Sequence, residues 1–253
     1  MQPAIVMPMH DPDGLMLPHL PAIVPQLKAI FACAVVSVTP ITRTRQPATI
    51  QHLMADNFFK VVDLPTARLV GEEFLLLYRH AATICQPDTI LHLCFMDRVA
   101  FALQSHYREH FITDLQAVKP EQTPLIFQRS PAAWQTHPSN YYELEHIVTR
   151  TGELLLQQSL DFAWCHLALQ AHQLQAVLPL IHRPDLSMMA ELVLSLKDKI
   201  QTQAVDWLAW EDPFIYGRDA QQLKQEREQS IAETRKRLAY VIPMLQLLEE
   251  TTR

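Results

Sequence analysis

Short apolar runs alternate with amphipathic segments through the first half of the chain. The apolar runs cover residues 4–9, 31–39, 58–62, 89–96 and 124–128. Each has the length of a strand, and residues 71–84 between two of them repeat apolar positions at helical spacing. This alternation predicts an α/β fold with a mixed, mainly parallel sheet flanked by helices, in which 4–9 and 89–95 run parallel.

The second half has longer helical patterns. Residues 141–181 are expected to be mostly helical, with breaks at Gly152 and Asp161. A last helix is expected to begin after Asp219 and to kink or end at Pro243. No repeat or linker interrupts the sequence, so we expect one domain over residues 1–253. A sheet half (1–130) would be followed by a helix-rich half (131–253).

The composition excludes some classes of binding site. The formal net charge of −6 argues against a nucleic-acid surface, which needs clustered Lys and Arg. Only four glycines occur, which excludes the glycine-rich phosphate loops of Rossmann and P-loop proteins. Any bound phosphate would therefore be held by side chains, a metal or a helix N-terminus.

Four cysteines without a CxxC pair are expected to be free thiols. The first lysine is Lys28, so a basic signal-peptide region is not expected. No apolar run approaches the ~18 residues that span a bilayer. We therefore expect a cytoplasmic protein without a transmembrane segment.

Three predicted strands end in acids. Asp97 follows 89–96, His10-Asp11 follows 4–9, and Asp63 follows 58–62. The carboxyl ends of neighbouring parallel strands meet at one edge, where open α/β sheets bind ligands, so these side chains are expected to share a crevice. Two alternatives remain open: Asp97 could cap a following helix, and Asp11 could belong to an ordinary turn.

These residues resemble the GT-A glycosyltransferases, which use nucleotide-diphospho-sugars. The similarity covers roughly residues 3–130, where the apolar run AIVMPM leads into His10-Asp11 and an acid follows the third strand, with one further patch near 205–219. Met96-Asp97-Arg98-Val99 stands where the family has an Asp-x-Asp metal motif. That motif is incomplete here, because Phe95 or Val99 replaces one Asp. A divergent or degenerate member is therefore expected.

The resemblance implies roles for particular residues. Asp97 would hold Mn²⁺ or Mg²⁺ against the donor diphosphate, and Arg43 or Arg98 would offset phosphate charge. Glu211 or Asp212 would deprotonate an unknown acceptor. The base and ribose of the nucleotide would lie against Pro8, Met9, His10, Asp11 and Asp63. The reaction would be metal-assisted departure of the nucleoside diphosphate.

The polar-aromatic stretch 128–145 is the expected acceptor site. Aromatic side chains with polar groups suit a sugar or another polar molecule. The candidate residues are Arg129, Trp134, His137, Asn140 and Tyr142. The alternative is a surface loop punctuated by prolines.

Two other functions stay open at this stage. The incomplete metal motif is compatible with a non-catalytic binding or scaffold protein on the same fold. A nucleotidyltransferase would also need a metal-binding carboxylate, and release of pyrophosphate would identify it. The sequence gives no indication of the oligomeric state.

Overall fold

The computed structural model describes residues 2–64, 66 and 68–251. Its seven described strands form one sheet in the order β3-β2-β1-β4-β6-β5-β7. The strands are β1 Ala4–Met9, β2 Cys33–Val38, β3 Phe59–Asp63, β4 Ile90–Cys94, β5 Leu125–Arg129, β6 His166–Gln170 and β7 Gln201–Val205. All neighbouring pairs are parallel except those that β6 makes with β4 and β5, which are antiparallel. The sheet is thus mixed and mainly parallel, as expected.

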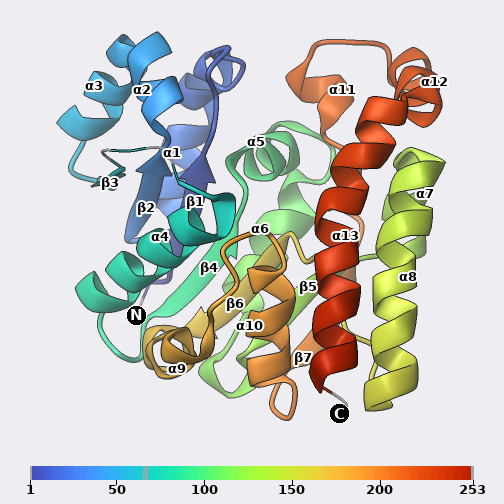
Figure 1. The fold of residues 1–253 in the computed structure, drawn as a ribbon. Coiled ribbons are helices and arrows are strands. Elements are labelled where there is room, and N and C mark those ends of the chain that lie inside the picture. Colours follow the sequence, from blue (N-terminus) through green and yellow to red (C-terminus); the bar gives the residue numbers. More distant parts are fainter. Residues whose placement is uncertain (1, 65, 67, 252–253) are drawn as a thin grey trace.

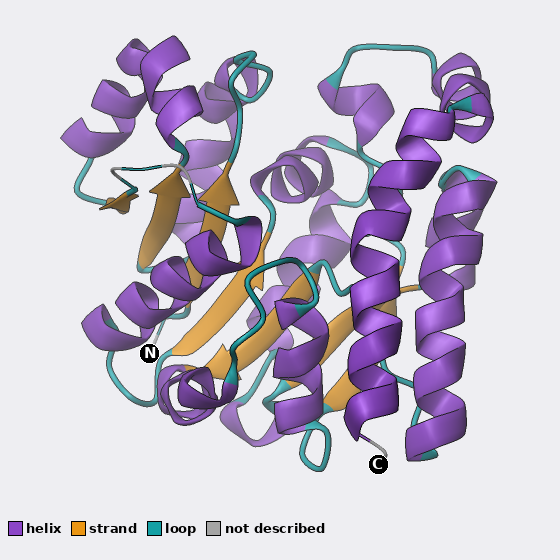
Figure 2. Ribbon diagram, in the orientation of Figure 1, coloured by secondary structure: helices purple, strands orange, loops and turns teal. Residues whose placement is uncertain are grey.

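Helices cover both faces of this sheet (Figures 1 and 2). Those of the first half are α1 Leu20–Ile30, α2 Pro40–Arg45, α3 Pro47–Ala55, α4 Val70–Ile84, α5 Met96–Gln104 and α6 Arg108–Ala117. Those of the second half are α7 Pro131–Thr136, α8 Ser139–Leu156, α9 Ala171–Val177, α10 Met188–Leu196, α11 Asp212–Ile215, α12 Ala220–Gln229 and α13 Ile231–Thr251. Single 3₁₀ turns lie at Leu17–His19, Pro120–Gln122 and Leu178–Leu180. No described helix is long and apolar enough to cross a membrane.

Side-chain alternation along the strands separates two cores. In β1, Ala4 and Val6 join a cluster with α4, α8, α9, α10 and α13, whereas Ile5 and Met7 join a cluster with α1, α3, α5 and α6. β1 is buried on both faces, which is why its sequence is a continuous apolar run. The register confirms the expected parallel pairing, with Val6 opposite Leu93 of β4.

The second half corrects the expected helical pattern. Residues 166–170 lie in the region expected to be mostly helical, yet they form β6, between β4 and β5. This run is rich in Leu and Ala and too short to show a period, and burial on both faces, not propensity, places it in the sheet. In β6, His166 Nε2 lies 2.9 Å from Nδ1 of His92 on β4.

The expected last helix is two helices, α12 and α13, which meet at Ser230. α13 does not end at Pro243 but continues to Thr251. It lies beside α8, and together they form the helical pair seen at the right of Figure 1. Residues 231–251 of α13 therefore pack against residues 139–156 of α8.

Candidate functional site

The first group of candidate residues lies at the carboxyl ends of β1, β2 and β3. His10 Nδ1 is 3.1 Å from Thr39 Oγ1, at the end of β2. Arg43, on α2, pairs through both terminal nitrogens with the carboxylate of Asp63, at 3.0 and 3.1 Å. The structure therefore brings Arg43 and Asp63 together at this edge.

Asp11 is engaged in the turn that follows β1. Its carboxylate accepts hydrogen bonds from the backbone N–H groups of Leu15 at 2.8 Å and Met16 at 2.9 Å. Its own N–H donates to Thr42 Oγ1 at 2.8 Å. These hydrogen bonds hold the turn closed, and Asp11 is correspondingly buried. Met9 is buried too, while Pro8 is half-buried and His10 exposed.

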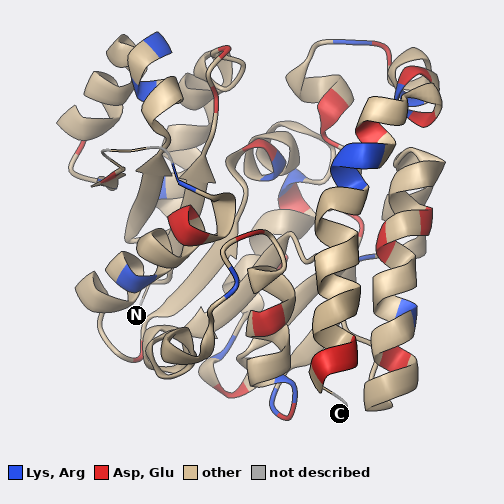
Figure 3. Ribbon diagram, viewed as in Figure 1, with Lys and Arg blue, Asp and Glu red and all other residues tan. Residues whose placement is uncertain are grey.

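A second group lies where α5 approaches α11. Asp97 and Arg98 are in the first turn of α5, and Glu211 precedes the first residue of α11, Asp212. Arg98 Nη1 lies 2.7 Å from Glu211 Oε2, and both side chains are almost fully buried. Asp212 pairs with Arg227 of α12 at 3.4 Å. We call Asp97, Arg98, Glu211 and Asp212 the α5–α11 cluster. Positive and negative residues also alternate along the helix ends next to it (Figure 3).

Burial controls the ionisation of this cluster. It raises the pKa of Glu211 to about 7, and the nearby Asp97 and Asp212 add to the shift, while Arg98 opposes it. Burial also raises the pKa of Asp97, against the opposing charge of Arg98. A carboxyl group whose pKa lies near neutrality is suited to proton transfer.

No hydrogen bond or ion pair joins the first group to the α5–α11 cluster among the described residues. The expected common crevice of His10, Asp11, Asp63 and Asp97 therefore stays a prediction. A cavity of about 400 Å³ lies elsewhere, near the amino ends of β1 and β4, where Pro3, Ile90 and His92 help to line it.

The stretch 128–145 is not a surface loop, which was the alternative to an acceptor site. α7 and the start of α8 occupy most of it. Ser130 caps α7, accepting a hydrogen bond from the N–H of Ala133 at 3.0 Å, and Pro131 takes the first helical position. Both are helix-start signals that can be read from sequence.

The candidate acceptor residues in this stretch divide by exposure. Tyr142 is exposed at 39% and stacks on His146 with ring centroids 4.9 Å apart. Trp134 packs over the guanidinium of Arg129 at 3.8 Å. Asn140 Nδ2 donates to the Arg227 carbonyl at 3.2 Å, so it ties α8 to α12.

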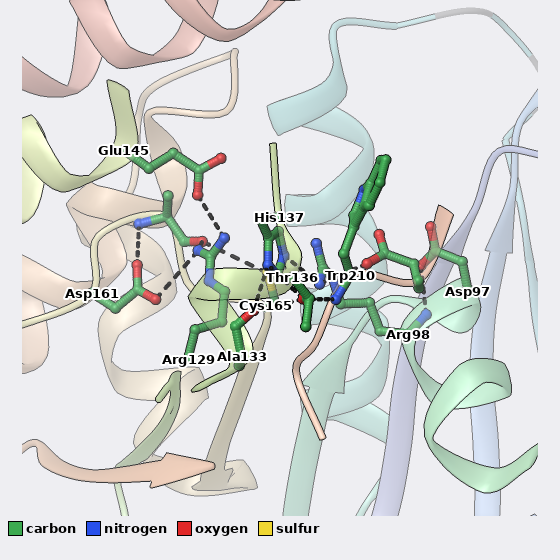
Figure 4. Close-up of polar contacts among 12 residues, drawn as sticks. Asp97, Arg98, Arg129, Ala133, Thr136, His137, Glu145, Asp161, Cys165 and Trp210 are labelled. Carbon is green, nitrogen blue, oxygen red and sulfur yellow. Dashed lines mark hydrogen bonds and ion pairs between the residues drawn. The ribbon is translucent and has the colours of Figure 1, made fainter. Parts of the chain in front are cut away.

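His137 and Arg129 are buried and contact other charged groups (Figure 4). His137 Nδ1 lies 3.0 Å from the Ala133 carbonyl and therefore donates to it. Its Nε2 is left to accept, and Arg98 Nη1 lies 3.5 Å away. Burial, with the charges of Arg98 and Arg129, holds the pKa of His137 well below its usual value, so the ring is neutral.

Arg129, at the end of β5, is the centre of a buried ion-pair network. It pairs with Glu145 of α8 at 2.8 Å and with Asp161 at 3.4 Å. Glu145 also accepts from Arg237 of α13 at 2.9 Å and from Tyr240 Oη at 2.6 Å. Burial alone would raise the pKa of Glu145, but Arg129 and Arg237 hold it below its usual value.

Sequence reasoning missed most of this network. Glu145, Asp161 and Arg237 of this network were not candidates, and neither was Arg227, the partner of Asp212, because nothing in their local sequence distinguishes them from solvated charges. Their proximity depends on how α8, α12 and α13 pack.

The residues present do not fit a divalent ion. Within the described part of the chain, no group of three or more His, Cys, Asp and Glu side chains is arranged to hold a metal. Asp97 Oδ1 accepts from the N–H of Arg98 at 2.8 Å, and the Arg98 guanidinium lies against Glu211. The expected role of Asp97 as a metal ligand stays a prediction that no contact within the described residues supports.

Solved structures of glucosyl-3-phosphoglycerate synthase from Mycobacterium tuberculosis resemble this chain in fold. One, in complex with Mn²⁺, UDP and phosphoglyceric acid, has a TM-score of 0.53 and 14% identity, over 96% of this chain and 78% of that chain. Another, with Mn²⁺, UDP and glucosyl-3-phosphoglycerate, has a TM-score of 0.54 and 12% identity, over 97% of this chain and 80% of that one.

The fold is GT-A-like. At these identities the likeness shows the fold alone, and it agrees with the mainly parallel sheet flanked by helices. No protein-family model matches the sequence, and neither does any curated protein. Function must therefore be argued from the site itself.

Proposed function

We propose that this protein binds a nucleoside-diphosphate sugar at the carboxyl edge of its sheet and transfers the sugar to an acceptor, as a divergent GT-A glycosyltransferase. One observation carries the proposal. Glu211 and Asp212, far along the chain, lie beside Asp97 and Arg98 at the end of β4. In open α/β sheets, ligands bind at this edge.

In this proposal the base and ribose lie against the first group, from Pro8 to Asp11 with Arg43 and Asp63. The diphosphate lies toward Arg98 and Asp97. The acceptor side is formed by Trp134, Asn140 and Tyr142, of which Tyr142 is exposed. His137 and Arg129 are both buried, so in this proposal they support the acceptor side from the protein interior.

Glu211 is the better candidate for the general base. Its pKa of about 7 lets it exist as a carboxylate at neutral pH and still accept a proton from an acceptor hydroxyl. The proton would pass from the acceptor oxygen to Glu211 as that oxygen bonds to the sugar carbon and the nucleoside diphosphate leaves.

A thermal-shift panel of nucleoside diphosphates tests the binding step. A ligand that binds only the folded state at ~100 times its Kd stabilises it by about 2.7 kcal/mol, so a specific nucleotide should raise the melting temperature. If no nucleoside diphosphate shifts the transition, the donor site is absent.

A non-catalytic binding protein is the second candidate, because each acidic side chain of the α5–α11 cluster already has a partner. Release of sugar from a nucleotide-sugar, measured with the wild type and Glu211→Gln, separates the two. Catalysis predicts turnover that Glu211→Gln lowers by about 10²-fold or more. Binding without turnover in both proteins would favour the scaffold.

A further inference from the structure

We infer that Arg98, and not a divalent cation, offsets the negative charge of the donor diphosphate at this site. The inference rests on the proposed function, because it names the group that would hold the diphosphate. Three features of the α5–α11 cluster support it. Its carboxylates already have contacts within the protein, the Arg98 guanidinium lies among them, and two nitrogens of that guanidinium make no hydrogen bond within the described residues.

The acids of the cluster are already engaged by the protein. Asp97 accepts from the N–H of Arg98 at 2.8 Å, and Glu211 Oε2 lies 2.7 Å from Arg98 Nη1. Asp212 Oδ2 lies 3.4 Å from Arg227. A cation binding through these same oxygens would have to displace an arginine or compete with a backbone hydrogen bond.

The guanidinium also places a positive charge among the carboxylates, next to Glu211. Burial alone would lower the pKa of Arg98, but nearby negative charges, those of Glu211 and Asp97 among them, raise it above its usual value. The exposed fractions of the Arg98 and Glu211 side chains are 12% and 8%, so water screens charge poorly around them. A divalent ion bound directly beside Glu211 would lie close to this fixed positive charge.

Arg98 retains donors that suit a diphosphate. Its known contacts, with Glu211 and His137, both use Nη1. Within the described residues, no hydrogen bond of Nη2 or Nε is seen, and the side chain as a whole is 12% exposed. A planar guanidinium presents such donors as a rigid fork that can bind two phosphate oxygens at once.

His137 holds this fork in place. Because its Nδ1 donates to the Ala133 carbonyl at 3.0 Å, its neutral ring presents only a lone pair at Nε2 to Arg98. The contact therefore adds no second positive charge next to Arg98. His137 is a positioning residue here, while Arg98 is the group that would contact the ligand.

Titration calorimetry on the full chain tests the inference. The probes are UDP, GDP, CDP, ADP and dTDP, each titrated in excess EDTA and again in excess MnCl₂. We expect one nucleotide to bind the wild type with the same Kd, within about twofold, in both buffers. Arg98→Lys keeps the charge beside Glu211 but loses the fork, and should weaken binding about tenfold, equivalent to ~1.4 kcal/mol.

Two further variants control for folding. The double variant Arg98→Met with Glu211→Gln replaces the buried pair by neutral side chains of similar size, so it should fold, and it should lose nucleotide binding in EDTA. Arg218→Ala removes an exposed arginine that pairs with Glu226, and should leave the Kd unchanged.

The outcomes separate this inference from the proposed function. A wild-type Kd that becomes tenfold or more tighter with Mn²⁺ would overturn the inference and leave the donor site standing. Equal affinity of the wild type and Arg98→Lys would also overturn it. If no probe binds in either buffer, the proposed donor site fails, and the inference fails with it.

Discussion

At the residue scale, the clearest energetic feature is the burial of Arg129 between two carboxylates. Its side chain is 2% exposed and that of Glu145 is 4% exposed. Such a pair adds little net stability relative to a well-packed apolar one, because both charges lose water. Removing Arg129 is different, since Asp161 would lose its ion-pair partner and Glu145 would keep only Arg237.

We therefore expect Arg129→Met to lower the free energy of unfolding by about 3–5 kcal/mol, because Glu145 and Asp161 lose their common partner. Arg150→Met is the matched control. Arg150 pairs with Glu153 on the surface of α8, and its loss should cost about 0–1 kcal/mol. Urea unfolding of both variants gives the comparison, and similar losses in the two would contradict this account.

At the scale of elements, strands were predictable from sequence where they are short apolar runs between helical segments. β1, β2 and β4 are continuous apolar runs and were expected within two residues of their observed ends. β7 was not expected as a strand, because it is a polar edge strand with the sequence QTQAV. β6 was missed because its place between β4 and β5 is decided by tertiary packing.

The histidine contact between β4 and β6 makes the stability of the fold depend on pH. His92 and His166 are buried against each other, and burial lowers the pKa of His92 to about 3 and that of His166 well below its usual value. The unfolded chain takes up these protons near pH 6.5 and the folded protein does not. Stability is therefore lost as the pH falls below about 6.5, by up to ~1.4 kcal/mol per pH unit for each histidine.

Replacing both His92 and His166 by Leu should flatten this slope, as measured by urea unfolding between pH 5 and 7. His80→Leu, an exposed change on α4, should leave the slope as in the wild type. If the double variant lost stability on acidification as steeply as the wild type does, the pair would not be its source.

Gly152 allows α8 to pack closely against Phe162. A Cβ at this position of α8 would lie 2.2 Å from Cε2 of Phe162, which is fully buried. Alanine favours a helix over glycine by about 1 kcal/mol, but this clash should outweigh that gain, so Gly152→Ala should destabilise by about 1–3 kcal/mol. Adding Phe162→Leu should recover part of the loss in a double-mutant cycle. A more stable single variant would show that the ring can move.

At the scale of the whole molecule, sequence gave the fold class but not the assembly of the site. The strand-end acids Asp63 and Asp97 were identified, because an acid after an apolar run is a local signal. The network of Arg129, Glu145 and Arg237 was not, because its members come from β5, α8 and α13. Such proximity is a property of packing and has no local pattern.

The expected boundary at residue 130 can be tested at this scale. β5 belongs to the first half, yet its partners among the described strands are β6 and β7 of the second half. A fragment of residues 1–130 would leave β5 unpaired and β4 with an open edge. We expect it not to unfold cooperatively in circular dichroism melts, whereas the full chain should. A cooperative melt of the fragment would show that the two halves fold separately.

The contact of Arg237 with Glu145 also constrains the order of events during synthesis. The ribosome releases α8 well before α13, at about 5–20 residues per second. Until α13 emerges, Glu145 lacks one of its two arginines and the hydroxyl of Tyr240. Glu145 therefore gains its full set of partners only after α13 has left the exit tunnel, and the buried network around it is completed last.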